Sequence, residues 1–183
     1  MSNIIAAAGL ILLRQNDSTK QFEVLLLKRN TKLRVHGGNW VFPGGKVDVQ
    51  DYQVLNHRPS EIDIKNPPPL SPNDYLKLMT QTALRETLEE ANARIQNPHL
   101  YTMIAVPHIS QVHIFFHGEL ADLNFSSGPE SLEVQLFDEA DIPWKELAFP
   151  TISTTLRRYF TDRQHTNNKD QNTPFPTHVF DIP

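Results

Sequence analysis

Three glutamates behind one arginine are the feature that most limits what this chain can fold into. Residues 85–90 read Arg-Glu-Thr-Leu-Glu-Glu. On a helix, Glu86, Glu89 and Glu90 would fall within a sector roughly 100° wide. Like charges four residues apart cost an isolated helix about 0.2–0.5 kcal/mol, and the helix dipole disfavours anions near a C-terminal end. A hard divalent cation would offset both costs, so the run predicts a metal-binding helix face.

A glycine turn about forty residues upstream supports this interpretation. It reads Phe42-Pro43-Gly44-Gly45, and glycines let the backbone approach a metal ion or a phosphate without an intervening side chain. A solvated acidic face is the simpler interpretation of any run of glutamates. The turn and the preceding arginine, which could pair with the glutamate four residues on, favour the metal site.

Composition narrows the class of protein. The chain has 183 residues, 39% hydrophobic and 21% charged, which suits one globular domain, and its net charge of −4 argues against a nucleic-acid partner. The absence of cysteine rules out disulfides, thiolate nucleophiles and cysteine-based zinc sites. The apolar run over residues 4–13 suits a buried strand better than a signal peptide or a membrane span. We therefore expect a cytoplasmic protein without a membrane partner.

The hydrophobic pattern predicts a layered domain of mixed α and β structure. Strands are expected over residues 4–14, 22–29, 100–106, 112–120 and 133–137.

Two helices are expected between and after these strands. The first should begin at Ser71, followed by a proline at N1, and run to about Ala91, with Leu84, Leu88 and Ala91 facing the core. The second should cover residues 150–163. Residues 52–70 are poorly patterned and should form a surface excursion, and the last twenty residues should form a loop or tail.

These residues resemble the signature of the Nudix hydrolase family. In that signature a glycine, five residues, an acid and seven residues precede Arg-Glu-hydrophobe-x-Glu-Glu-x-Gly-hydrophobe. Gly45 corresponds to the glycine, Asp51 to the acid and residues 85–90 to the helical core. About 26 residues are inserted inside the signature, at about 52–74. The usual glutamate, hydrophobe and glycine are replaced by Asp51, Thr87 and Asn92.

Two subfamilies share further parts of the sequence. Residues 87–93, 106–109, 129–134 and 142–144 are similar to the zinc-ribbon Nudix enzymes, although the ribbon itself needs cysteines. That similarity implies ADP-ribose, FAD or NADH as substrate. Residues 41–48, followed by the insertion, resemble the coenzyme A diphosphatases with interrupted signatures.

The resemblance implies an α+β Nudix fold, an α/β/α sandwich around a mixed sheet, as one domain over residues 1–183. It implies a pyrophosphohydrolase that uses Mg²⁺ or Mn²⁺ to cleave a nucleoside diphosphate linked to another moiety. A coenzyme A diphosphatase and a non-catalytic nucleotide-binding regulator are the alternatives. The partner is a small-molecule nucleotide in each case. The 52–74 insertion is a substrate lid, a homodimer element or a tolerated surface insertion.

The resemblance also assigns the metal site. Glu86, Glu89 and Glu90 would hold the cations, with the carbonyl of Gly44 or Gly45 as a further ligand. Arg85 would orient Glu89, whereas Asp51 is interpreted as a turn residue or helix cap.

Residues outside the signature complete the expected site. The base for the attacking water is expected to be Glu133, or else Glu130 in the loop before it. Arg29, Arg34, Gly45 and His108 are candidates for substrate contacts, although charged residues at strand ends are more often ordinary surface. Aromatic residues beside the glycine turn could stack on a base but more often belong to a core.

Overall fold

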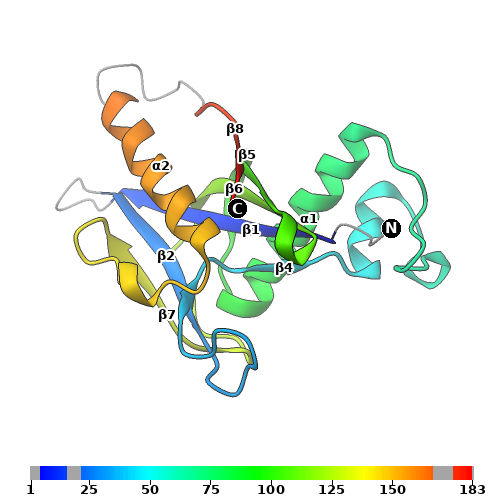
Figure 1. Ribbon diagram of the computed structural model, residues 1–183. Helices are drawn as coiled ribbons and strands as arrows, with labels where there is room; N and C mark the ends of the chain where they lie inside the picture. Colours follow the sequence, from blue (N-terminus) through cyan, green and yellow to red (C-terminus); the bar gives the residue numbers. More distant parts are fainter. Residues whose placement is uncertain (1–4, 16–21, 167–174, 183) are drawn as a thin grey trace.

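A central mixed sheet organises the molecule in the computed structural model, which describes residues 5–15, 22–166 and 175–182 (Figure 1). Within these residues the sheet runs in the order β3-β2-β1-β6-β5-β8, and β4 pairs with β1 and β7 with β2. β1 is parallel to β6 and β5 is parallel to β8, whereas the other pairs are antiparallel. The strands are β1 (Ile5–Gln15), β2 (Phe22–Arg29), β3 (Trp40–Val41), β4 (Gly44–Lys46), β5 (Ile95–Val106), β6 (Gln111–Leu120), β7 (Ser131–Asp138) and β8 (His178–Asp181).

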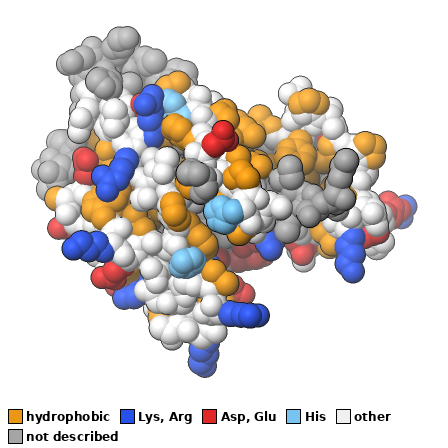
Figure 2. Space-filling model, viewed as in Figure 1, with side chains coloured by type: hydrophobic (Ala, Val, Ile, Leu, Met, Phe, Trp, Pro, Cys, Tyr) orange, Lys and Arg blue, Asp and Glu red, His pale blue; other side chains and the backbone are white. Residues whose placement is uncertain are grey.

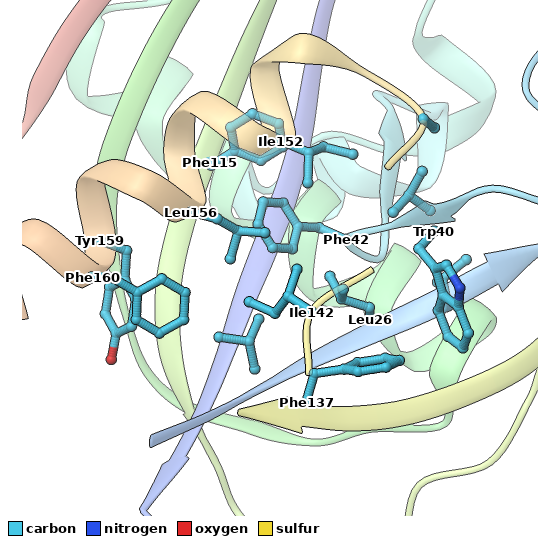
Figure 3. Close-up of a cluster of buried hydrophobic side chains, with 14 of the residues drawn as sticks. Leu26, Trp40, Phe42, Phe115, Phe137, Ile142, Ile152, Leu156, Tyr159 and Phe160 are labelled. Carbon is cyan, nitrogen blue, oxygen red and sulfur yellow. The ribbon is translucent and has the colours of Figure 1, made fainter. Parts of the chain in front are cut away.

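Two helices, α1 (Pro72–Ala91) and α2 (Pro150–Thr166), cover opposite faces of the sheet. Alternate residues of β2 and β6 belong to different hydrophobic clusters, as expected for a sheet covered on both faces. The α2 cluster, shown in Figure 3, includes Leu26, Phe115, Ile152 and Leu156. The α1 cluster includes Leu25, Leu78, Met79 and Phe116. The expected α/β/α sandwich is confirmed. Short 3₁₀ helices occupy four connections: η1 (Val49–Leu55), η2 (Pro59–Glu61), η3 (Pro107–Ile109) and η4 (Trp144–Glu146).

Local signals set the ends of α1. The Ser71 side chain accepts a hydrogen bond from the Asp74 N–H, and Pro72 opens the helix, as expected. Asn92 ends it in a left-handed conformation with φ of 47°, and its N–H bonds to the Leu88 carbonyl. Asparagine adopts this conformation readily, which explains how it can replace the glycine of the family pattern.

The buried face of α1 differs from the expected stripe. Leu88 is 50% exposed, and the buried positions are Leu78, Met79, Thr82, Ala83, Thr87 and Ala91. Of the expected stripe, Ala91 is buried and Leu84 packs against the α1 cluster. The expectation was wrong for Leu88, because β4 partly covers the glutamate side of the helix. Thr87 is fully buried but its hydroxyl bonds to the Ala83 carbonyl at 2.7 Å, so it can occupy a position usually held by a hydrophobe.

The insertion is partly integrated into the core. Tyr52 is 3% exposed within the α1 cluster, where Leu55, Ile62 and Leu70 also pack. The insertion and the first turns of α1 form a lobe at one side of the molecule (Figure 1), and Figure 2 shows hydrophobic side chains on its surface. The exposed hydrophobic residues of this part include Val54, Ile64, Tyr75 and Leu76.

The expectation of a C-terminal loop or tail was wrong for residues 178–181. They form β8, which lies parallel to β5 with Thr102 opposite His178. A side-chain contact supports the strand, because His178 Nε2 lies 2.6 Å from Asp162 Oδ2 on α2. Residues 167–174 and 183 of the expected tail lie outside the described residues. In the described part of the chain, no helix combines the length and the apolar character needed to cross a membrane.

Candidate functional site

An open cavity of about 700 Å³, called here the acidic cleft, lies where β4 meets the C-terminal half of α1. The helix contributes Glu86, Glu89 and Glu90 to its wall. Gly44 and Gly45 of β4 form the facing wall. The structure therefore brings together the glycine turn and the three glutamates, which are separated by about forty residues in the sequence.

The glycines allow α1 and β4 to approach closely. The Gly44 N–H donates to Glu90 Oε2 at 2.9 Å. The Glu86 carboxylate occupies the space that a side chain on residue 45 would need, so any residue other than glycine there would displace Glu86. The turn thus positions two of the three carboxylates.

Arg85 connects the remaining parts of the cleft. Its Nη1 lies 3.0 Å from Glu86 Oε1 and donates to Glu89 Oε2 at 3.0 Å. Its Nη2 donates to the Lys46 carbonyl at 3.0 Å, and its Nε donates to Asp51 Oδ1 at 2.8 Å. The Asp51 hydrogen bond, with the neighbouring negative charges, raises the pKa of the guanidinium. One permanent cation thus holds two carboxylates of the cleft in place.

Asp51 anchors this arrangement from beneath. It is 1% exposed, and its Oδ2 accepts from the Asp48 N–H at 2.8 Å and from Thr82 Oγ1 at 2.9 Å, in addition to Arg85. The bond to Asp48 belongs to a capping box at the start of η1. Asp51 therefore caps η1, as expected, and it faces the guanidinium and not the open cleft.

Burial changes the ionisation of the cleft glutamates. Burial raises the pKa of Glu90 to about 7, although the Gly44 N–H opposes the shift, and burial likewise raises the pKa of Glu86. Two carboxylates that lose solvation without full compensation are stabilised by an added positive charge.

The residues fit a divalent cation by their chemistry. Arg85 contacts one carboxylate oxygen of Glu86 and one of Glu89, and the Gly44 N–H contacts one of Glu90. Carboxylate oxygens together with a backbone carbonyl are suitable ligands for Mg²⁺ or Mn²⁺. Among the described residues, no three acidic or histidine side chains are already close enough together to form a metal centre. The donors are therefore present in one cleft, and cation binding would draw them together.

A loop between β6 and β7 completes the cleft at the end of α1. The Gly128 N–H and Ser131 Oγ both donate to the Glu90 carbonyl at 2.9 Å. A side chain on Gly128 would collide with the backbone of Glu89 and Glu90. This contact brings Glu130 to the edge of the cleft. The dipeptide Gly128-Pro129 had indicated only a turn, and nothing in the sequence named its partner.

Arg29 and Lys46 are the basic residues of the cleft besides Arg85. The end of β2 places Arg29 there as expected, and its Nε is buried without a hydrogen-bond partner among the described residues. Lys46 was not predicted, although it directly follows the glycine turn.

Three predicted site residues do not line the acidic cleft. Arg34 is exposed in the loop after β2, and His108 is exposed in η3, between β5 and β6. Glu133, the first candidate for the base, is exposed on β7 opposite Lys28 and lies past the loop that reaches the cleft. Its alternative, Glu130, lines the cleft.

No protein-family model and no curated protein matches the chain. Among solved structures, a NUDIX hydrolase from Nitrosomonas europaea is similar with a TM-score of 0.70 and 34% identity, covering 100% of this chain and 80% of that one.

Two further structures share the fold at low identity. An ADP-ribose pyrophosphatase from Streptococcus suis has a TM-score of 0.57 and 11% identity, over 98% of this chain and 100% of that one. The NUDIX domain of Shewanella oneidensis NrtR, complexed with ADP ribose, has a TM-score of 0.53 and 17% identity, over 90% of each chain.

The first of these similarities extends beyond the fold. It spans every residue of this chain at 34% identity, and the chain places a glycine turn, an Arg-Glu-x-x-Glu-Glu helix and their connecting ion pairs around one cleft. The chain therefore belongs to the Nudix hydrolase family, enzymes that hydrolyse phosphoric anhydride bonds.

Proposed function

We propose that this Nudix hydrolase is a divalent-cation-dependent pyrophosphohydrolase that cleaves a nucleoside diphosphate linked to another moiety. ADP-ribose is the first candidate substrate, followed by FAD and NADH. The observation that carries the proposal is one cleft lined by Glu86, Glu89 and Glu90 on one side and by the cationic side chains of Arg29 and Lys46 on another. That arrangement suits a diphosphate bridged to the acidic wall by metal ions.

The protein groups have separate tasks in this proposal. Mg²⁺ or Mn²⁺ held by the three glutamates and the Gly44 carbonyl would neutralise the diphosphate and lower the pKa of a water. Arg29 lines the cleft, and its guanidinium donates to a phosphate oxygen. Lys46 adds a second positive charge at the same wall.

Glu130 is the proposed base for the attacking water. It lines the cleft on an exposed loop, and its charge contributes to the raised pKa of Glu90. A carboxylate at the edge of the cleft can exchange its proton with solvent, whereas a metal-bound carboxylate is a poor proton acceptor. Glu130→Gln should therefore lower kcat and leave metal binding in place.

A substrate panel tests the proposal. ADP-ribose, FAD, NADH, coenzyme A, diadenosine polyphosphates and nucleoside triphosphates are incubated with Mg²⁺ or Mn²⁺, and products are identified by mass spectrometry. We expect metal-dependent release of AMP from ADP-ribose. Release from coenzyme A instead would assign the chain to the alternative substrate class, and tight binding with no turnover of any compound would indicate a regulatory module.

Variants of the acidic wall test its role directly. Glu89→Gln and Glu90→Gln should abolish turnover without unfolding the protein, whereas Glu139→Gln, an exposed glutamate outside the cleft, should not change it. Mg²⁺ at 100 times its dissociation constant should stabilise the wild type by about 2.7 kcal/mol and raise its melting temperature. A cleft variant with a near wild-type rate, or with the same Mg²⁺-induced rise in melting temperature as the wild type, would contradict the assignment.

A further inference from the structure

A second cavity of about 210 Å³ adjoins the acidic cleft, and we call it the side chamber. The two cavities share Arg29, Gly44, Gly45 and Lys46, so one continuous surface leads from the three glutamates into the chamber. The chamber lies between the sheet and the start of α2. A group attached to a diphosphate in the cleft could extend into it without leaving the protein surface.

Three phenylalanine rings line the chamber. Phe42 and Phe115 pack edge to face with ring centroids 5.4 Å apart, beside Ile152 (Figure 3), and Phe149 lines the chamber from just before α2. Gly9 of β1 also lines the chamber, and its missing side chain lets the Phe115 ring and Pro43 pack against the strand. A Cβ there would lie 3.1 Å from the Phe115 ring and 3.2 Å from the Pro43 carbonyl oxygen, so a larger residue would press on the Phe115 ring.

One polar group interrupts this wall. His113 Nε2 lies 3.0 Å from Gln111 Oε1, and its Nδ1 lies 2.9 Å from Thr151 Oγ1. Burial lowers the pKa of His113, so the ring is neutral at pH 7. Because the amide oxygen only accepts, Nε2 carries the proton and Nδ1 accepts from the threonine. Both ring nitrogens are thus used, and the Gln111 amide NH₂ has no hydrogen-bond acceptor among the described residues.

We infer that the side chamber binds the nucleobase of the substrate and that Gln111 selects the base by donating a hydrogen bond to a ring acceptor. The inference rests on the proposed function, which places the diphosphate in the adjoining cleft. Pockets that hold whole ligands measure about 300–1,000 Å³, so a chamber of this size suits a single ring system. Aromatic walls favour a flat ring, and the cationic residues lie only where the chamber meets the cleft.

Nucleoside binding tests this inference without requiring catalysis. Adenosine, guanosine, cytidine and uridine, with ribose as the base-free control, are titrated into the metal-free protein by calorimetry. We expect one nucleoside to bind and ribose not to bind. Gln111→Leu should weaken binding of that nucleoside about three- to tenfold, which is the effect of losing one hydrogen bond. Gln135→Leu, the same change on an exposed position of β7 outside both cavities, should bind as the wild type does.

Gly9→Ala provides a second test, because a Cβ there presses on the Phe115 ring of the chamber, and circular dichroism confirms that it folds. The substitution should weaken binding of the same nucleoside and leave the Mg²⁺-induced rise in melting temperature unchanged. In turnover, Gln111→Leu should raise KM for the substrate carrying that base with kcat unchanged, the signature of lost uniform binding.

The outcomes separate the subsite from the proposed function. Diphosphate hydrolysis without nucleoside binding, or equal nucleoside binding by wild type and Gln111→Leu, would refute the subsite and leave the proposed function standing. Nucleoside binding that depends on Gln111, with no diphosphate hydrolysed, would support the subsite and refute the proposed function.

Discussion

Asp51→Asn is the substitution that most directly tests how the acidic cleft is built. Asp51 Oδ2 accepts three hydrogen bonds, from the Asp48 N–H, Thr82 Oγ1 and Arg85 Nη2, and its Oδ1 accepts one from Arg85 Nε. An asparagine would keep the three by placing its oxygen at the Oδ2 position. Its NH₂ would then face the Nε–H of the guanidinium, donor against donor.

The expected cost follows from these contacts. A hydrogen bond to a charged group contributes about 1.5–3 kcal/mol, and removing one partner of a fully buried ion pair costs about 3–5 kcal/mol. The Arg85 side chain is 15% exposed and retains Glu86 and Glu89, which favours the lower values. We therefore expect a loss of about 2–3 kcal/mol in the free energy of unfolding, or roughly 4–12 °C in melting temperature for a domain of this size.

Urea denaturation of the metal-free protein at pH 7 measures the effect, with Asp48→Asn as the matched control. Asp48 is exposed and caps η1, where asparagine serves as well as aspartate, so this control should change stability by less than about 0.5 kcal/mol. A double-mutant cycle with Arg85→Gln should give a coupling energy above about 1 kcal/mol. A small loss for Asp51→Asn, or independent effects of the two residues, would show that the ion pair does not hold the cleft together.

Three further predictions concern other parts of the fold. Burial lowers the pKa of His117 to about 4, so the unfolded chain binds a proton that the folded chain excludes between pH 6.5 and 4, and stability falls as pH falls through that range. The free energy of unfolding, measured by urea denaturation, should therefore be lower at pH 4.5 than at pH 7, and His117→Phe should reduce this difference by about 1–2 kcal/mol, a value discounted for the partial exposure of the ring. A variant with the same difference as the wild type would disprove this explanation. Gly128→Ala should destabilise the protein by about 1–3 kcal/mol by forcing the loop off α1, whereas Ser127→Ala should be neutral in the same melt. Asp162→Asn should lower stability by about 1–3 kcal/mol by weakening its bonds to Tyr101 and His178 and should speed proteolysis near β8, and equal digestion rates would count against that anchor.

The sequence was sufficient for features that depend on neighbouring residues. Short apolar runs such as residues 24–27 located the long strands, and Ser71 followed by a proline located the start of α1 correctly. The rotation of that helix was not predictable from the same pattern. Leu88 has the hydrophobicity of a core residue but is exposed, because contacts of Glu86 and Glu90 with a distant glycine turn set which face is covered.

Features that depend on distant partners were missed for the same reason. β8 is a short strand at the sheet edge, and its support from Asp162 on α2 cannot be read from its own four residues. The placing of Glu130 in the cleft and of Glu133 outside it depends on the Gly128 contact and on a register shift where β7 meets the end of β2. The sequence alone favoured Glu133, with Glu130 as the alternative, because neither contact can be read from the chain.

The insertion between Asp51 and Arg85 shows how the signature can be interrupted without losing the site. The ion pair closes the ends of this segment, and lengthening a closed loop from seven residues to the length of residues 52–84 costs only about 1.4 kcal/mol. Burying a large side chain such as Tyr52 returns about 1.5–3 kcal/mol, and Leu55, Ile62 and Leu70 pack beside it. The gain matches or exceeds the entropic cost.

Shortening the segment to seven residues should therefore lower stability even though the loop becomes shorter, and a stabilised deletion variant would show that its packing contributes nothing. Substrate kinetics of the same variant would separate a lid, which alters substrate preference, from a purely structural insertion, which does not.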